Sequence, residues 1–179
     1  ASMFRKILIY GLIAGVVVGG TLFGMMVMMS GGPPLKYGEL IGYSSMLIAL
    51  SAVFVGVKRY RDEDRGGVIG FWPALGMGLA ISLVASLCYT LAWEASLAVT
   101  HADFIGAYTE QIIAQKQASG ASAAEVAQFT AEMNAFKAQY AQPLFRMLVT
   151  ISEILPVGVL VSLISAALLR NSRFLPARR

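Results

Sequence analysis

Apolar residues occur along the chain in four long blocks separated by polar segments. The blocks cover about residues 7–29, 39–57, 71–99 and 144–169. A helix rises 1.5 Å per residue and the hydrocarbon core of a membrane is about 30 Å thick, so about 20 apolar residues make one crossing. The pattern predicts an all-α integral membrane four-helix bundle. Ala1 and Ser2 precede Met3 and are interpreted as an expression remnant, which leaves a single membrane domain at 3–179.

The polar stretch at 103–142, between the third and fourth blocks, has a helical pattern of its own. Apolar residues recur at three- and four-residue spacing, as Phe104, Tyr108 and Ile112 in its first half and as Val126, Phe129, Met133, Phe136 and Tyr140 in its second. Ser119-Gly120 separates the halves, and Ser122 with Glu125 has capping-box spacing. We expect an extramembrane helical hairpin whose apolar seam either closes the hairpin internally or binds a partner.

Lysine and arginine predict the orientation, because basic flanks are retained in the cytoplasm. One side of the predicted bundle has Arg5, Lys6, Lys58, Arg59, Arg61, Arg65, Arg170, Arg173, Arg178 and Arg179. The other side has Lys36, Lys116 and Lys137. Both termini are therefore expected in the cytoplasm of a bacterial cell, with the hairpin outside the inner membrane.

Composition supports a membrane protein and argues against nucleic-acid binding. The chain is 57% hydrophobic and 13% charged, whereas soluble domains carry about 25% charged residues. Its net charge of +4 comes from basic residues beside the apolar blocks, where they contact anionic lipids. The first apolar run is longer than the apolar region of a signal peptide, which has about 7–15 residues, and is expected to remain as an anchor.

Glu153 is the most informative candidate, because it lies about ten residues inside the fourth block. A carboxylate within a membrane is costly unless it is paired or protonated, and such residues often mark ion or proton pathways. A protonated glutamate that donates one structural hydrogen bond is the alternative. We expect Glu153 to point into the bundle and to find a hydroxyl partner among Ser45, Ser86 and Tyr89.

Three further charged residues are predicted at the outer end of the bundle. Glu94 lies near the outer end of the third block and Arg146 near the outer end of the fourth, so these two are expected to pair more closely than Arg146 and Glu153. Glu39 begins the second helix, where the helix dipole favours a carboxylate. With Tyr89 below them, these groups are compatible with an outward-open vestibule.

Glycines recur every four residues along the first block. Gly11, Gly15 and Gly19 form one row, and Gly20 and Gly24 form a second small-xxx-small pair. Such rows let two helix backbones approach closely. The neighbour is either another helix of the same chain or a second subunit.

No residue pattern predicts a catalytic, cofactor or metal site. The chain has no Walker loop, GxSxG elbow, HExxH helix or dinucleotide fingerprint, and its single cysteine, Cys88, lies in an apolar block. Met25, Met26, Met28 and Met29 surround their helix, which favours apolar packing over copper binding. His101 lacks neighbouring ligands, and the loop 58–65 is interpreted as a solvated topology signal, with partner docking as its alternative.

Several motifs resemble the bacterial membrane family called domain of unknown function 4199. They are Gly56-Val-Lys58-Arg59-Tyr60-Arg61-Asp62, Gly66-Gly67-Val68-Ile69 with Phe71, Tyr89-x-x-x-Trp93-Glu94, Ala118-Ser119-Gly120-Ala121-Ser122, Pro143-Leu144-Phe145 and Glu153-Ile-Leu-Pro156-Val-Gly158. The resemblance covers nearly the whole chain. It implies a four-helix membrane protein without an established activity, and it supplies no catalytic residues.

These features predict a non-enzymatic accessory, scaffold or assembly protein of the inner membrane. The alternative is a small oligomeric transporter or channel subunit built around Glu153. A lipid-modifying enzyme with Glu94 or Glu153 as general base lacks a visible nucleophile. The expected partners are membrane lipids together with a second copy of the chain or another membrane protein, and no cofactor is expected.

Overall fold

The computed structural model describes residues 2–29, 38–100 and 104–178. In these ranges the chain forms helices and no strand, as the sequence predicted. The helices are α1 (Ser2–Met29), α2 (Gly38–Arg59), α3 (Phe71–Thr100), α4 (Phe104–Ala118), α5 (Ala123–Tyr140) and α6 (Pro143–Leu169), with a π-helical turn η1 (Tyr60–Asp64) after α2. Helices α1, α2, α3 and α6 match the four apolar blocks to within a few residues, except that α1 begins five residues earlier.

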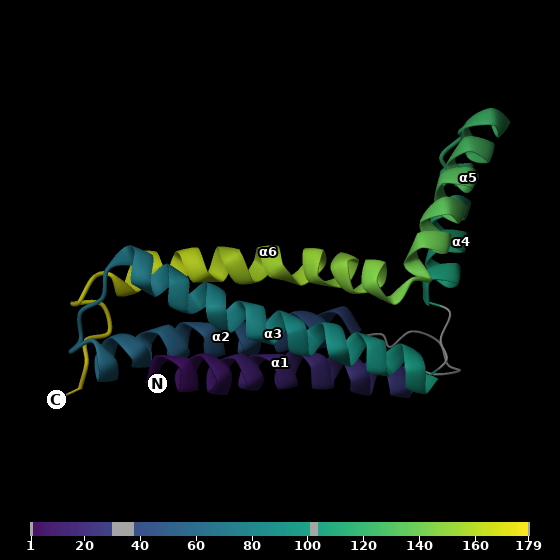
Figure 1. The fold of residues 1–179 in the computed structure, drawn as a ribbon. Helices are drawn as coiled ribbons and strands as arrows, with labels where there is room; N and C mark the ends of the chain where they lie inside the picture. The colour runs from purple at the N-terminus through teal and green to yellow at the C-terminus, as the bar shows by residue number, and fades with distance from the viewer. Residues whose placement is uncertain (1, 30–37, 101–103, 179) are drawn as a thin grey trace.

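The four long helices run side by side, and the shorter pair α4 and α5 projects from one end of them (Figure 1). The two chain ends and η1 lie together at the opposite end of the bundle (Figure 1). An ion pair of 2.9 Å between Lys6 Nζ in α1 and Asp64 Oδ2 in η1 joins two of these segments. The chain ends and the turn between α2 and α3 therefore share one face of the protein.

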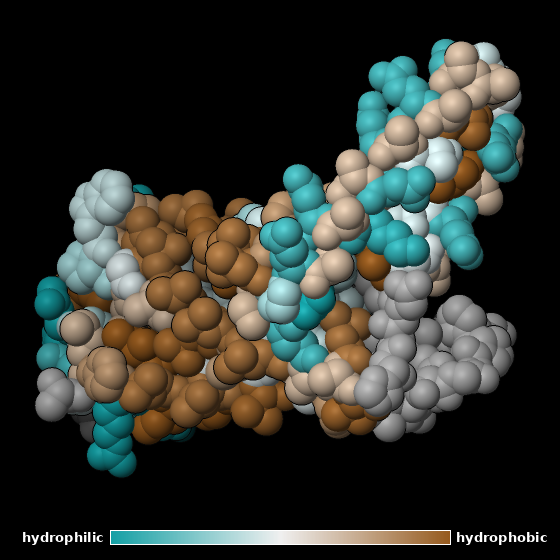
Figure 2. Space-filling model, turned by 45° about the vertical axis from the view of Figure 1, so that its right-hand side comes forward, coloured by the Kyte–Doolittle hydropathy of each residue, from teal (hydrophilic) through white to brown (hydrophobic). Residues whose placement is uncertain are grey.

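Three helices of the described chain are long and apolar enough to cross a membrane. They are Ser2–Met25, Phe71–Val99 and Pro143–Leu169. Large apolar side chains point outward along them, among which Val16, Leu91 and Leu160 are 67%, 63% and 57% exposed. Apolar residues cover most of the bundle face seen in Figure 2, and polar residues gather on the hairpin. This distribution indicates a multi-pass membrane protein.

The first glycine row of α1 packs against α3. A Cβ atom on Gly11 would meet Cβ of Val84 at 2.5 Å, and one on Gly15 would meet Sγ of Cys88 at 2.9 Å. Gly19 approaches the next residue of the same α3 face, Ala92, in the same way. The neighbour that the sequence left open is thus a helix of the same chain.

The second glycine pair has no such neighbour in the described part of the chain. A Cβ atom on Gly20 or Gly24 would meet nothing within 4 Å there. These two glycines lie on a different side of α1 from the row that contacts α3. The expected close packing at this pair is therefore not found among the described residues.

Small residues also join α3 to α6. A Cβ atom on Gly78 would meet Oγ of Ser162 at 2.8 Å, and one on Gly158 would meet Cβ of Ser82 at 2.7 Å. Ser82 Oγ donates a hydrogen bond of 3.2 Å to the Gly158 carbonyl. This contact was not among the sequence-based expectations, although Gly78, Ser82, Ser86 and Thr90 repeat every four residues along the third block.

The hairpin has the predicted capping box and seam. Glu125 N donates to Ser122 Oγ at 3.2 Å, and Ser122 N donates to Glu125 Oε2 at 3.0 Å. On α5 the apolar seam residues are shielded from solvent wholly or in part, and Lys116 of α4 lies 5.7 Å from the Phe129 ring centre. The seam is thus used, at least in part, to close α4 against α5.

Some sequence-based expectations lie outside what the structure describes. This holds for His101, for the side chains of Glu39 and Phe104, and for those of Met26, Met28 and Met29. Among the described residues no three His, Cys, Asp or Glu side chains gather into a metal site.

Candidate functional site

A cavity lies where the projecting hairpin meets the bundle. Its volume is about 400 Å³, and α1, α3, α4, α5 and α6 all contribute to its wall. The lining residues are Leu22, Tyr89, Trp93, Ile105, Tyr108, Phe136, Tyr140, Val149, Thr150 and Glu153. Half of these are aromatic and one is charged, so the cavity combines an aromatic wall with a single carboxylate.

Trp93 of α3 and Tyr140 of α5 hold the hairpin to the bundle. The indole Nε1 of Trp93 donates a hydrogen bond of 2.9 Å to Tyr140 Oη, and both side chains are buried. Phe136 adds ring contacts with Tyr140 and with Phe145 of α6, at centroid distances of 5.9 and 6.0 Å. These contacts fix part of the cavity wall, because they leave the rings little freedom to move.

Glu153 lines this cavity together with Tyr89, one of the three residues whose hydroxyl was expected to bond to it. The expected hydrogen bond from a hydroxyl is not formed, since Glu153 has no hydrogen bond or ion pair with any residue that the structure describes. Ser86 donates instead to the Ser82 carbonyl of its own helix, at 2.7 Å. Glu153 is an exposed residue of α6 that lines the cavity, and it does not point into the interior of the four-helix bundle as expected.

Glu94 and Arg146 form the predicted ion pair at the same end of the bundle. Arg146 Nε donates to Glu94 Oε1 at 2.7 Å, and Arg146 Nη2 donates to Glu94 Oε2 at 2.6 Å. Both side chains are less than one-fifth exposed. Two parallel hydrogen bonds of this kind match the flat guanidinium to the carboxylate and tie α3 to α6.

We expect Glu94 and Arg146 to be energetically coupled. In a double-mutant cycle with Glu94→Gln and Arg146→Gln, the coupling free energy should be about 1–3 kcal/mol, because each single change leaves the other charge without its partner. The measurement is unfolding of the purified variants in mild detergent. Strictly additive effects of the two changes would show that the pair does not stabilise the α3–α6 contact.

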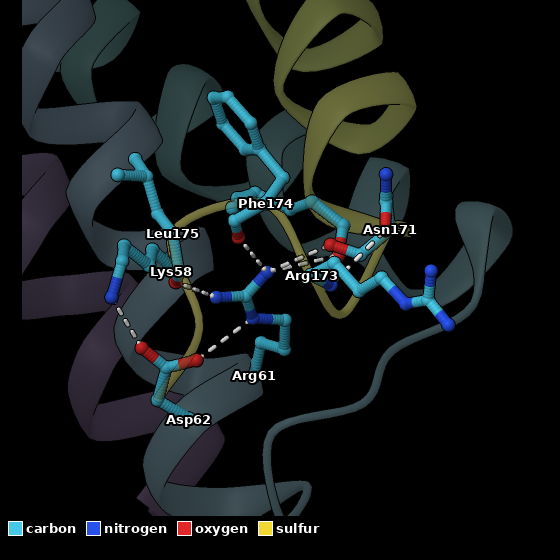
Figure 3. A network of polar contacts seen from close by, with 8 residues as sticks. Lys58, Arg61, Asp62, Asn171, Arg173, Phe174 and Leu175 are labelled. Carbon is cyan, nitrogen blue, oxygen red and sulfur yellow. Dashed lines mark hydrogen bonds and ion pairs between the residues drawn. The ribbon is translucent and has the colours of Figure 1, made fainter. Parts of the chain in front are cut away.

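A buried arginine organises the opposite end of the bundle. Arg61 of η1 is fully buried, and its Nη1 donates to the carbonyls of Leu169, Asn171 and Phe174 at 3.3, 3.4 and 3.0 Å. Its Nη2 donates to the Leu175 carbonyl, so the guanidinium holds the segment that follows α6 (Figure 3). The interpretation of 58–65 as a wholly solvated loop is therefore wrong at Arg61, which has a tertiary role.

Asp62 holds the buried Arg61 in place by accepting hydrogen bonds from two basic side chains. Arg61 Nε donates to Asp62 Oδ1 at 2.8 Å, and Lys58 Nζ donates to Asp62 Oδ2 (Figure 3). Burial by itself would raise the pKa of Asp62, but the hydrogen bonds from Lys58 and Arg61 outweigh it and lower the pKa below its usual value. The carboxylate therefore stays charged and offsets the buried guanidinium.

Sequence reasoning found some of these residues and missed others. It paired Glu94 with Arg146 correctly, whereas the hydroxyl partner expected for Glu153 among Ser45, Ser86 and Tyr89 is not found. It missed Trp93 and Tyr140 as cavity residues, although the four-residue spacing of Tyr89 and Trp93 puts both on one face of α3. The cavity exists because the base of the hairpin meets this end of the bundle, which no local pattern reveals.

Comparison with known proteins supports the resemblance seen in the sequence. A family model described as "Protein of unknown function (DUF4199)" matches residues 9–171. No curated protein and no solved structure matches the chain. Because the match spans nearly the whole sequence, the chain belongs to the DUF4199 family.

Proposed function

We propose that this protein is a non-enzymatic accessory or scaffold protein of the bacterial inner membrane. The observation that carries the proposal is the α4–α5 hairpin, which projects from the bundle and touches it at its base (Figure 1). Along the projecting part, polar and small side chains such as Glu110, Gln128 and Glu132 are exposed. Such an arm extends the protein beyond the lipid surface and suits contact with another protein.

The same proposal includes four crossings with both termini in the cytoplasm. Helix α2 runs antiparallel beside α1, and its residues from Leu40 to Val57 carry no charge. The chain ends lie with η1 at one end of the bundle, as an even number of crossings requires. That end also has most of the lysines and arginines, which favours its cytoplasmic placement.

Cysteine labelling tests this orientation. In a Cys88→Ala background, a cysteine at Ser119 in the hairpin turn should react with an impermeant maleimide in intact spheroplasts. A cysteine at Arg65 should react only after the membrane is opened. Labelling of Arg65→Cys and protection of Ser119→Cys in intact spheroplasts would invert the topology.

Site-specific photo-crosslinking tests the scaffold role. A photoreactive amino acid at Glu132 on the hairpin should give a discrete protein adduct in cells, whereas one at Leu91 on the apolar face of α3 should react with lipid. A hairpin position that yields no protein adduct at native expression levels would contradict the proposal. Identification of the adduct by mass spectrometry would then name the partner.

A small transporter or channel subunit is the second candidate, and Glu153 in its cavity favours it. The adjoining hollow among α1, α2, α3 and α6 is about 40 Å³ and is lined chiefly by apolar residues. A continuous aqueous path would therefore need a second subunit or a different conformation. Ion or solute flux in proteoliposomes that is lost in Glu153→Gln would support this candidate over the scaffold.

A further inference from the structure

The charge of Glu153 is uncompensated within the described chain. Glu94 and Arg146, two other charged residues at this end of the bundle, neutralise each other through two hydrogen bonds. Arg146 also lies 6.0 Å from the ring centre of Tyr140. Tyr140 lines the cavity, whereas Arg146 is not among its lining residues. A carboxylate in a partly apolar site favours a cation beside it, because desolvation weakens its contact with water.

The cavity around Glu153 has the composition of a site for an organic cation. Tyr89, Trp93, Tyr108, Phe136 and Tyr140 all line it. The faces of aromatic rings attract ammonium groups, most strongly where water is excluded. A metal ion fits less well, because one carboxylate is a poor ligand set and no second acidic, His or Cys residue is among the described residues that line the cavity.

The size and position of the cavity also suit such a ligand. Its volume of about 400 Å³ falls in the range of about 300–1,000 Å³ that is usual for small-molecule sites. Glu153 lies ten residues after Pro143, so about 15 Å of helix separate it from the start of α6. The hairpin residues Tyr108, Phe136 and Tyr140 lie on the other side of the cavity, toward the membrane surface.

We propose that this cavity binds an organic ammonium group, with the Glu153 carboxylate as counter-ion and the aromatic side chains as its wall. The ammonium group belongs either to a lipid headgroup or to a small soluble cation, since both present a positively charged nitrogen to the carboxylate and the rings. The proposal goes beyond the scaffold function and does not depend on it.

The soluble source is tested by tryptophan fluorescence. Trp72→Phe leaves Trp93 as the single indole, because the chain has two tryptophans. In nanodiscs of phosphatidylglycerol, which has no ammonium group, choline chloride is titrated against sodium chloride at equal ionic strength. If the ligand is soluble, the fluorescence should change saturably with choline concentration. Glu153→Gln should weaken the affinity for choline about tenfold or more.

The lipid source is tested by native mass spectrometry. Protein from nanodiscs of phosphatidylglycerol mixed with phosphatidylethanolamine should retain phosphatidylethanolamine, and Glu153→Gln should lose it. Retention of this lipid without choline binding assigns the site to a headgroup. Choline binding that phosphatidylethanolamine does not block assigns it to a soluble amine.

Two further comparisons separate binding from folding. Glu132→Gln removes a carboxylate from the exposed hairpin and should leave binding unchanged. Tyr89→Phe keeps an aromatic ring and should bind like the parent, whereas Tyr89→Leu should bind several-fold more weakly at the same melting temperature. The proposal is overturned if neither ligand binds, or if Glu153→Gln and Glu132→Gln have equal effects.

Discussion

Replacing Arg61 with methionine is expected to lower the free energy of unfolding by about 3–5 kcal/mol, the largest effect of any single change considered for this chain. The arginine is fully buried and donates to four backbone carbonyls and to Asp62. Methionine matches the aliphatic part of the side chain but leaves those carbonyls and the Asp62 carboxylate without their donor. Thermal unfolding in mild detergent measures the loss.

Two variants serve as comparisons for Arg61→Met. Arg59→Met removes an exposed arginine two residues earlier and should cost less than about 1 kcal/mol. Arg61→Lys keeps the charge, but a single ammonium group cannot donate to all the carbonyls that the forked guanidinium reaches. This variant should therefore recover only part of the stability. Equal stability of the Arg61 and Arg59 variants would show that the guanidinium does not hold the segment after α6.

Gly15→Leu is expected to destabilise the bundle by about 1–3 kcal/mol or more, because a side chain there would separate α1 from α3. A single Cβ atom on Gly15 already comes within 2.9 Å of Cys88 Sγ and 3.4 Å of the Ala85 Cα atom. The backbone of α3 cannot move away from it without breaking the neighbouring contacts at Gly11 and Gly19. The melting temperature in detergent measures this effect.

Val16→Leu is the matched control for Gly15→Leu. Val16 is the next residue of α1 and is 67% exposed on the apolar outer surface, so a larger aliphatic side chain there meets no protein atom in its way. Its melting temperature should stay within a few degrees of the parent. Identical melting temperatures for the two leucine variants would mean that the α1–α3 contact is looser than the structure shows.

The local pattern was sufficient to predict the four long helices to within a few residues, apart from the start of α1, which lies five residues earlier than expected. An apolar block that crosses a membrane must form a helix, because its backbone N–H and C=O groups find no water in lipid and must hydrogen-bond within the segment. Any other conformation would leave these groups unpaired at a high free-energy cost. The capping box at Ser122 and Glu125 was equally readable, since both of its hydrogen bonds join residues three apart. Glu94 and Arg146 were paired correctly because helix direction and length alone bring them to one level.

Other features depended on which helix faces which, and this only the tertiary structure decided. The glycine row of α1 predicted a close helix contact but not its partner. The partner is a face of α3, about seventy residues further along the chain. Arg61 looked like one more basic residue of a loop, because its acceptors are backbone carbonyls beyond residue 168 that no side-chain pattern marks. The cavity at Glu153 arises from five helices together. Sequence periodicity determines which residues share one face of a helix, whereas the packing of the whole bundle determines which helix that face contacts.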